Sequence, residues 1–338
     1  MKSFASDNYS GVHPEIMDAI ISANHDHQAS YGDDEITGTT HAVFQEHFGD
    51  VAVLYTFNGT GANILCLKCT TLPFQSVICT DTAHIHVDEC GAPTQSIGCS
   101  LTPIPTQDGK LNPAMIESQL AFLGNVHHTQ PKVISISQST ELGTIYSLNE
   151  LSALADFAHK NNLYLHVDGA RICNAAATLG CSLKEATVDC GVDIMSFGGT
   201  KNGLMMGEAV LIFNETLKKH ARYYHKQTAQ LYSKNRFMSG QFKALLSNEL
   251  WKRTASHANN MALLLATELS KVEEVIITQQ VQANAVFVII PKYVVEPLRK
   301  MYRFYDWNTE TGELRWMCSF DTTAEEVMCF VRTLKELL

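Results

Sequence analysis

Two segments of the chain place a charged side chain directly after a short apolar run. In residues 163–171, Asp168 follows the run that begins at Leu163. In residues 193–203, Lys201 lies in a glycine-rich loop after another short apolar run. Parallel α/β sheets bind ligands beyond the carboxyl ends of their strands, and glycine lets a backbone turn sharply beside a ligand. The spacing therefore predicts that a carboxylate and an amine face one ligand.

A carboxylate and a lysine at one edge of a sheet suit pyridoxal phosphate. The lysine forms a Schiff base with the aldehyde, and the carboxylate keeps the pyridine nitrogen protonated so that the ring accepts electrons from a substrate. Each residue alone also has a simpler interpretation. Asp168 fits a helix cap, and Lys201 fits a solvated loop residue.

Residues 58–61, Asn-Gly-Thr-Gly, predict a turn from a strand into a helix. The free N–H groups at the start of a helix favour a phosphate, and Thr60 adds a hydroxyl. A dinucleotide-binding fingerprint needs a third glycine where this chain has Ile64, so dinucleotide binding is disfavoured. The alternative is that the turn only caps the helix.

Further polar side chains gather in the segment that contains His84, His86, Asp88 and Glu89. The flat imidazole of His84 can stack on a cofactor ring. The same four residues also have the chemistry of metal ligands, but no second cluster has matching spacing, so we expect no metal site.

Cys66 and Cys69 form a C-x-x-C pair inside an apolar helical stretch, and without a second pair we interpret them as core residues. His127 and His128 precede a predicted strand. They offer either a catalytic base or an exposed surface pair.

The elements that must position these residues alternate from about residue 51 to residue 212. Apolar runs separated by helical stretches predict a mainly parallel central sheet that is flanked by helices. Ser147 and Glu150 form a capping box at the start of one of these helices. The predicted strands are residues 51–57, 76–79, 132–137, 163–167, 193–196 and 208–213.

After about residue 250 the pattern changes to a few strands and helices, which predicts a smaller α+β domain. We therefore expect a large cofactor-binding domain over residues 1–250, with the segment 1–20 reaching the active site, and a small domain over residues 251–338. A capping box of Thr322 and Glu325 predicts the start of the last helix. The other elements expected there are helices at 255–271 and 293–301 and strands at 275–278, 285–290 and 313–319.

Composition excludes several classes of protein. The 338 residues are 45% hydrophobic and 18% charged, which excludes wholesale disorder. A net charge of −10 without a basic block argues against nucleic acid and anionic membranes as partners. Ten scattered cysteines indicate reduced thiols, and neither a secretory signal nor an apolar run of membrane-spanning length is visible. We expect a cytoplasmic protein that acts on a small molecule.

Taken together, these segments resemble the low-specificity L-threonine aldolase family, whose members are pyridoxal-phosphate enzymes of the aspartate aminotransferase fold. The resemblance implies cleavage of L-threonine, L-allo-threonine or a related β-hydroxy amino acid such as phenylserine to glycine and an aldehyde. It also implies a homo-oligomer, a dimer or tetramer, with sites built across subunit interfaces. The matching stretches, in the order of the family, are residues 6–14, 31–34, 58–63, 84–92, 166–171 and 198–203.

The resemblance also implies roles for individual residues in cofactor binding. Lys201 would hold the cofactor through a Schiff base, Asp168 would pair with the pyridine nitrogen, and His84 would stack on the ring. Thr200 and Lys201 are followed by Asn202 and Gly203, whereas some members have Ser-Lys-Gly-Leu there, a departure that affects substrate preference. The residues that would cradle the phosphate are Gly59, Thr60 and Thr200.

The substrate side of the site follows from the same resemblance. Arg171 would contact the ring hydroxyl oxygen and the side of the substrate carboxylate, which Ser6 and Arg315 would bind. Tyr31 would line the site of a neighbouring subunit. His84 or His127 would remove the hydroxyl proton of the substrate. The alternatives are a β-eliminating lyase or aminotransferase of the same fold, and a non-catalytic homologue that binds a ligand.

Overall fold

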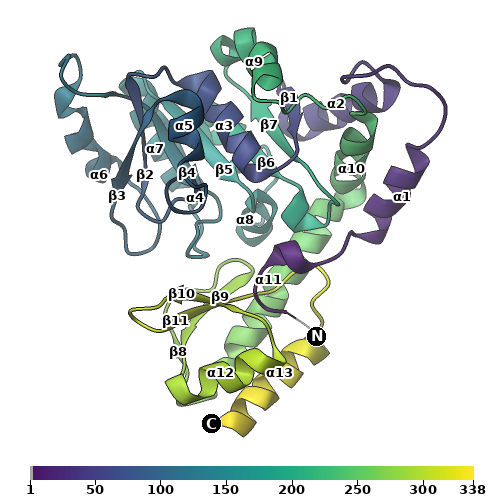
Figure 1. Ribbon diagram of the computed structural model, residues 1–338, viewed down its shortest axis with the longest axis vertical. Helices are drawn as coiled ribbons and strands as arrows, with labels where there is room; N and C mark the ends of the chain where they lie inside the picture. The colour runs from purple at the N-terminus through teal and green to yellow at the C-terminus, as the bar shows by residue number, and fades with distance from the viewer. Residues whose placement is uncertain (1–2) are drawn as a thin grey trace.

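The computed structural model describes residues 3–338, and its larger part is built on a seven-stranded sheet (Figure 1). The strand order is β1-β7-β6-β5-β4-β2-β3, and only the two pairings of β7 are antiparallel. The prediction of a mainly parallel sheet is confirmed. The strands are β1 (Ala52–Thr56), β2 (Gln75–Thr80), β3 (Ser100–Ile104), β4 (Gln130–Ser137), β5 (Tyr164–Gly169), β6 (Ile194–Gly198) and β7 (Glu208–Ile212).

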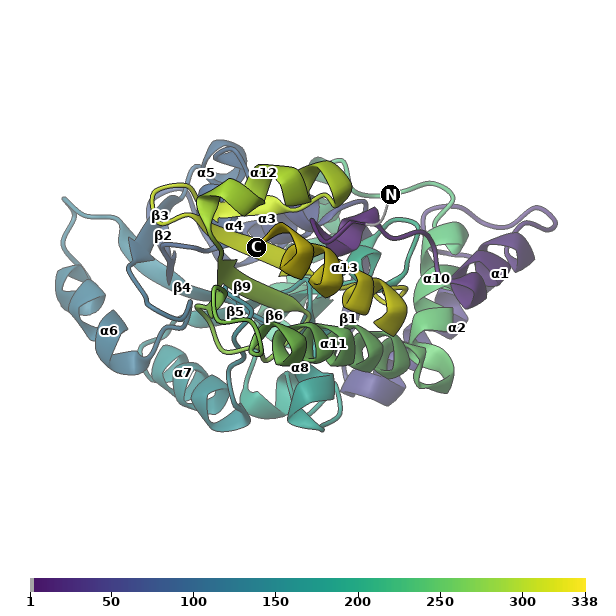
Figure 2. The same cartoon turned by 90° about the horizontal axis from the view of Figure 1, so that it is seen from below.

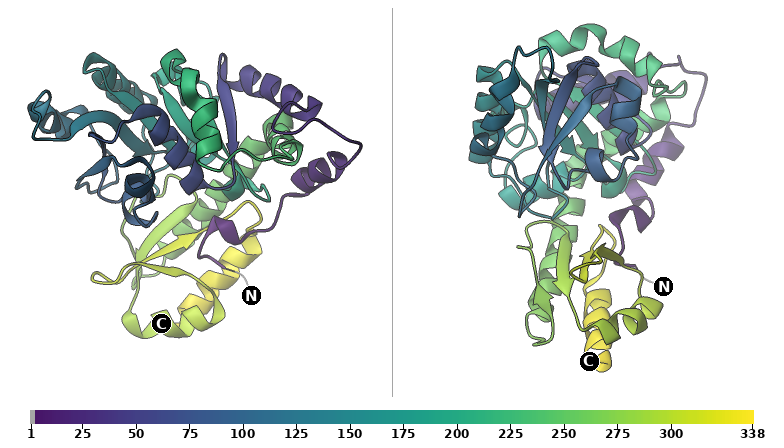
Figure 3. Two further views of the ribbon diagram at one scale, coloured as in Figure 1. Left: turned by 45° about the horizontal axis from the view of Figure 1, so that its top comes forward. Right: turned by 60° about the vertical axis from the view of Figure 1, so that its left-hand side comes forward.

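Helices cover both faces of this sheet because its strands are apolar on both sides. In β6, Ile194 packs against the face that carries α3 (Gly59–Thr70) and α9 (Glu215–Gln227), while the next residue, Met195, packs against the opposite face. Figure 3 shows the two helical layers on either side of the strands. The helices of the opposite face are α2 (Glu35–Phe48), α7 (Leu148–Lys160), α8 (Ile172–Leu179) and α10 (Arg236–Leu246).

Short helices complete the large part of the molecule. The predicted capping box of Ser147 and Glu150 is present at the start of α7 and is confirmed. The short helices are α1 (Pro14–Ser22), α4 (His84–Val87), α5 (Ala92–Ile97), α6 (Pro113–Glu117) and the 3₁₀ turns η1 (Asp7–Tyr9), η2 (Ser118–Phe122), η3 (Val188–Cys190), η4 (Thr200–Asn202) and η5 (Ser247–Glu249).

The smaller part contains an antiparallel sheet with the order β10-β11-β9-β8. Its last helix begins one residue later than predicted, because Thr323 and Glu326 form the capping box while the hydroxyl of Thr322 accepts a hydrogen bond from the backbone of Ser319. The elements are β8 (Ile276–Ile277), β9 (Ala285–Ile289), β10 (Tyr305–Asn308), β11 (Glu313–Met317), α12 (Lys292–Met301) and α13 (Ala324–Leu337).

Two segments tie the small sheet to the large one. The backbone of Phe4 bonds to Arg303 and Met317, each at 2.8 Å, so the first described residues join the small part. α11 (Leu250–Leu269) contacts both α8 and α13, and Figure 2 shows it beside α13. The predicted domain division after residue 250 falls at the start of this shared helix and stays a prediction.

Candidate functional site

The carboxyl ends of β4, β5 and β6 surround a cavity. Its walls include five of the predicted site residues, which come from four different segments of the chain. This position agrees with the general placement of ligands in open α/β sheets. The five residues are Gly59, His84, Asp168, Arg171 and Lys201.

Asp168 lies inside β5, not in a helix cap, and three donors hold its carboxylate. Its Oδ2 atom accepts a hydrogen bond from the amide of Asn63 at 2.8 Å. Its Oδ1 atom accepts from the backbone of Ala170 at 3.0 Å and from the hydroxyl of Ser196 at 3.5 Å. Burial opposes the charge, but Lys201 and these donors lower the pKa of Asp168 below its ordinary value. The carboxylate is therefore anionic at neutral pH.

Lys201 reaches the cavity from the η4 turn, and the glycines around it are needed for close packing. A Cβ atom on Gly198 would lie 2.3 Å from the carbonyl oxygen of Ala170, and Gly203 has a φ of +100°. Burial and the guanidinium of Arg171 lower the pKa of Lys201, and the nearby carboxylates only partly oppose this. The amine of Lys201 is therefore easier to deprotonate, and so more nucleophilic at neutral pH, than an exposed lysine.

His84 begins α4, and two carboxylates hold it in place. Its Nδ1 atom lies 2.9 Å from Oε1 of the buried Glu89, and its backbone N–H donates to Oε1 of Glu141 at 2.9 Å. The hydrogen bond to Glu89 raises the pKa of His84, although burial opposes this effect.

Over residues 3–338, no group of three or more metal-ligating side chains is arranged to hold an ion.

Arg171 is held by the N-terminal segment of the chain. Its Nε and Nη2 atoms donate to the two carboxylate oxygens of Asp7 at 2.8 and 2.9 Å, and Asn284 donates to the same carboxylate at 3.0 Å. Burial opposes ionisation of Asp7, but Arg171 lowers the pKa of this carboxyl. A planar, bidentate pair of this kind fixes the guanidinium against the wall of the cavity.

Glu208 opens β7 and also lines the cavity, although it is not among the predicted site residues. The Oε2 atom of Glu208 accepts a hydrogen bond from the backbone of Gly199 at 2.7 Å. Burial raises the pKa of Glu208 to about 7, despite this bond and another from Thr200. A charged residue that begins an otherwise apolar strand was the signal in the sequence.

The predicted phosphate cradle lies at the start of α3. Asn58 caps this helix by accepting a bond from Gly61 at 2.8 Å, so the amides of Gly59 and Thr60 remain among the unpaired N–H groups of the first turn. Thr200 lies next to Lys201 in the η4 turn, where its hydroxyl donates to the carbonyl of Gly207 at 3.4 Å.

Six predicted site residues are not among the residues that line this cavity: Thr60 and Thr200, which adjoin Gly59 and Lys201 in the chain, and His127, Ser6, Arg315 and Tyr31. His127 is exposed in the loop before β4, a strand that spans roughly 25 Å and carries the cavity at its other end. Ser6 lines a separate cavity beside Tyr9. Arg315 donates to the carbonyl of Ala5 at 3.4 Å. The geometry of this chain alone brings neither Ser6 nor Arg315 into the cavity, and the role of His127 has no support in it.

Tyr31 lines a further cavity, under the outer strand β1, together with Arg222. The amine of Lys226 lies 5.2 Å from the centre of the Tyr31 ring. Tyr31 does not line the cavity that contains Lys201, and its predicted role in a neighbouring subunit stays a prediction.

Both cysteines of the C-x-x-C pair lie within α3 and pack in the core, as predicted. Burial raises the pKa of Cys69 to about 12, and it also raises the pKa of Cys66 well above its ordinary value. Thiols of this kind are protonated at neutral pH and are poor nucleophiles.

The cavity suits pyridoxal phosphate on the chemistry of its own walls. A buried amine with a lowered pKa can take up an aldehyde, and a buried anionic carboxylate can face a protonated ring nitrogen. A histidine ring and the first turn of a twelve-residue helix supply a stacking group and a phosphate site. Buried polar atoms without partners, such as Oδ1 of Asn63, remain in the wall for a bound molecule to satisfy.

Comparison with known proteins agrees with this chemistry. A family model described as beta-eliminating lyase matches residues 3–292. The low specificity L-threonine aldolase of Pseudomonas aeruginosa is 42% identical over 99% of this chain and 97% of its own length. That of Saccharomyces cerevisiae is 27% identical over 86% of this chain and 75% of its own. The solved structure of Leishmania major threonine aldolase superposes with a TM-score of 0.94 at 30% identity, covering 100% of this chain and 99% of that one.

Proposed function

Because the chain belongs to the beta-eliminating lyase family, we propose that it is a pyridoxal-phosphate-dependent aldolase that cleaves L-threonine and L-allo-threonine to glycine and acetaldehyde. Other L-β-hydroxy-α-amino acids, such as phenylserine, are further candidate substrates. The observation that carries the proposal is that Lys201 and Asp168 line the same cavity. The charge of Lys201 lowers the pKa of Asp168, and the charge of Asp168 raises the pKa of Lys201.

The residues divide the work of holding the cofactor. Lys201 would provide the amine, Asp168 would keep a proton on the ring nitrogen, and the first turn of α3 with Thr200 would bind the phosphate. Pyridoxal phosphate, when bound, supplies an aldehyde for the amino group of the substrate and a cationic ring that takes up the electron pair of the breaking bond.

Cleavage of the Cα–Cβ bond requires removal of the proton of the β-hydroxyl group, after which acetaldehyde leaves and Cα gains a proton to give glycine. His84 is the residue best placed to accept the hydroxyl proton, because it lines the cavity and its Nδ1 atom is bonded to Glu89. The Nε2 atom then remains to accept a proton, and the paired carboxylate strengthens it as a base.

A substrate panel tests the proposal. The purified protein, supplied with pyridoxal phosphate, is incubated with L-threonine, L-allo-threonine and phenylserine, and glycine release is measured; acetaldehyde is followed by an NADH-linked assay. We expect equal amounts of glycine and aldehyde. Release of a keto acid and ammonia without glycine would instead identify an eliminating lyase, and conversion of the bound cofactor to its amine form would identify an aminotransferase.

We also propose that the enzyme is a cytoplasmic homo-oligomer. Ten free cysteines support a reducing compartment. Within residues 3–338 no helix is long and apolar enough to cross a membrane. The exposed Tyr31, together with Arg222, is the part of the surface for which the family resemblance implies a subunit contact. Light scattering on the purified protein measures the number of subunits.

A further inference from the structure

The loop that follows β4 brings two unassigned polar side chains, Ser139 and Glu141, to the wall of the cavity. Within the described residues, Oγ of Ser139 and Oε2 of Glu141 are both shielded from solvent and have no hydrogen-bond partner. The other carboxylate oxygen of Glu141, Oε1, accepts hydrogen bonds from the hydroxyl of Ser137 at 2.5 Å and from the backbone of His84 at 2.9 Å. The carboxyl group is thus fixed at one oxygen and unsatisfied at the other.

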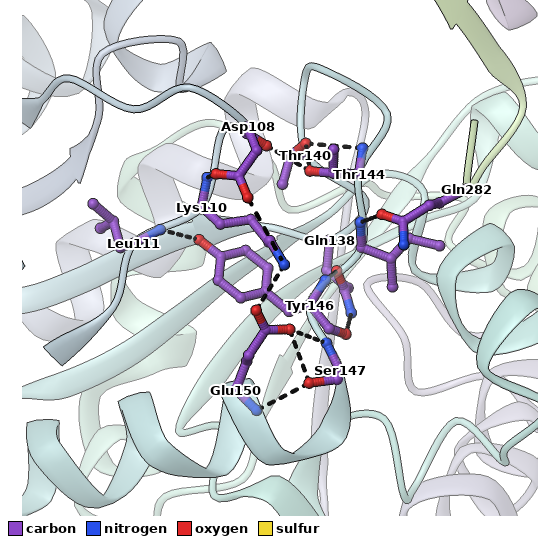
Figure 4. Close-up of polar contacts among 11 residues, drawn as sticks. Asp108, Lys110, Leu111, Gln138, Thr140, Thr144, Tyr146, Ser147, Glu150 and Gln282 are labelled. Carbon is purple, nitrogen blue, oxygen red and sulfur yellow. Dashed lines mark hydrogen bonds and ion pairs between the residues drawn. The ribbon is translucent and has the colours of Figure 1, made fainter. Parts of the chain in front are cut away.

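Hydrogen bonds made by Gln138, Thr140 and Thr144 anchor this loop (Figure 4). The side-chain amide of Gln138 pairs with the backbone of Tyr146 through two bonds of 2.9 and 3.0 Å. The hydroxyls of Thr140 and Thr144 are 2.7 Å apart, and Thr144 donates to the carbonyl of Asp108 at 2.6 Å. The positions of Ser139 and Glu141 therefore follow from a well-bonded loop.

Buried polar atoms without partners are rare in native proteins because each costs the free energy of its lost hydration. Two such atoms, only two residues apart on the wall of one cavity, indicate that a bound molecule satisfies them. Because Oε1 of Glu141 already accepts two hydrogens, a proton on this carboxyl belongs on Oε2. Oε2 and the hydroxyl of Ser139 then both act as donors.

We propose that Glu141 and Ser139 form a two-donor contact with an acceptor oxygen of the molecule that fills the cavity. The inference rests on the proposed function, since that molecule is then pyridoxal phosphate or the amino acid bound beside it. Both carry acceptor oxygens, and the experiment below distinguishes them.

The surroundings of Glu141 support a proton on its carboxyl. Burial raises the pKa of Glu141, and the charge of Asp168 adds to this effect, while Ser137 and the backbone of His84 lower it. The other titratable or charged groups in the walls of the cavity are Arg171, Lys201, Glu208 and the imidazole of His84.

Four variants test the contact: E141A, E141Q, S139A and the control T140V. E141A and S139A remove one donor each, whereas E141Q keeps an acceptor oxygen and an N–H donor. T140V removes the neighbouring hydroxyl, which bonds to Thr144, and so reports any loosening of the loop. Two quantities are measured for each protein: the dissociation constant of pyridoxal phosphate from the apo-protein, by titration of its visible absorption, and the dissociation constant of glycine from the cofactor-loaded protein.

We expect one of the two constants to rise about 10-fold or more in E141A and about 3- to 10-fold in S139A, with E141Q losing less than E141A. A rise for pyridoxal phosphate places the acceptor oxygen on the cofactor, and a rise for glycine alone places it on the amino acid. The inference is overturned if neither constant moves, if E141Q loses as much as E141A, or if T140V loses as much as S139A. If the wild-type protein binds no pyridoxal phosphate, the proposed function itself fails.

Discussion

Two neighbouring regions of the cavity differ in whether their buried charges form direct ion pairs. At the sheet edge, Lys201 and Asp168 influence each other's pKa, yet the carboxylate is held by Asn63 and other neutral donors. At the N-terminal side, Asp7 and Arg171 form a bidentate ion pair that Asn284 completes. The groups of the first region remain available to a ligand, whereas the charges of the second already neutralise one another.

This difference indicates a division between chemistry and architecture. A buried charge without a direct ionic partner lowers the stability of the fold but can bind a ligand. A buried charge that is fully paired can instead hold two parts of the chain together. Here the pair connects the N-terminal segment, which is hydrogen-bonded to the small sheet, with the end of β5 in the large sheet. Substitution of Lys201 should therefore lower activity without lowering stability, whereas substitution of Asp7 should lower stability.

The largest expected effect is that of Lys201→Ala. We expect the rate of threonine cleavage to fall by about 10⁴-fold or more, because no other amine takes the place of Lys201. The visible absorption of bound cofactor, reducible by borohydride, should disappear. In contrast, the free energy of unfolding of the apo-protein should stay the same or increase, since a buried lysine is no longer desolvated. A variant with near-normal turnover would contradict the assignment of Lys201.

Asp7→Asn should give the reverse result, a loss of stability. It leaves the guanidinium of Arg171 buried without a counter-charge, which costs about 3–5 kcal/mol. Urea unfolding of the apo-protein measures this loss. The control is Glu15→Gln, which breaks an exposed pair with Arg253 and should change stability by less than about 0.5 kcal/mol. Equal losses in the two variants would refute the view that the Asp7 pair joins the two parts.

Glu208→Gln should change how stability depends on pH. The pKa of Glu208 rises from 4.5 to about 7 on folding. The folded chain therefore binds the proton more tightly, and stability falls as pH rises through this interval. The shift corresponds to about 3 kcal/mol. Urea unfolding of the apo-protein at pH 4 and pH 8 should show that the wild type loses about 3 kcal/mol more than the variant; parallel curves would exclude the raised pKa.

The smallest effect is expected for Glu89→Gln. The hydrogen bond from Glu89 raises the pKa of His84, so its loss should lower that pKa. Because the proposed base must be deprotonated, the acidic limb of the pH profile of kcat/KM for L-threonine should move to lower pH. An unmoved limb would mean that a group other than His84 controls the profile.

Much of the large sheet was predictable because its strands are buried on both faces and read as apolar runs. β3 was missed, since its sequence Ser-Leu-Thr-Pro-Ile is polar and contains a proline, which an edge strand tolerates. The last capping box was placed one residue early because Thr322 and Thr323 are chemically equivalent in the sequence. Only their hydrogen bonds tell them apart.

Asp168 was predictable because it lies at the end of a parallel strand. Lys201 was predictable because it lies in a loop that is unusually rich in glycine. Glu141 and Ser139 also follow such a strand, but their neighbours are ordinary loop residues. His127 gave a plausible motif in the sequence, yet β4 separates it from the cavity of its own chain. A residue next to a strand in the sequence can lie at either end of that strand, and only one end adjoins the cavity.

The amino-acid sequence alone determined the alternation of strands and helices, the amine and the carboxylate of the site, and the family, because these depend on local patterns and on spacing along the chain. The tertiary structure alone decided which charges are neutralised. The partner of Arg171 lies 164 residues away, and the free oxygen of Glu141 is unsatisfied only because its loop is bonded elsewhere. Such pairings depend on distances between side chains from separate elements, and only the folded chain sets those distances.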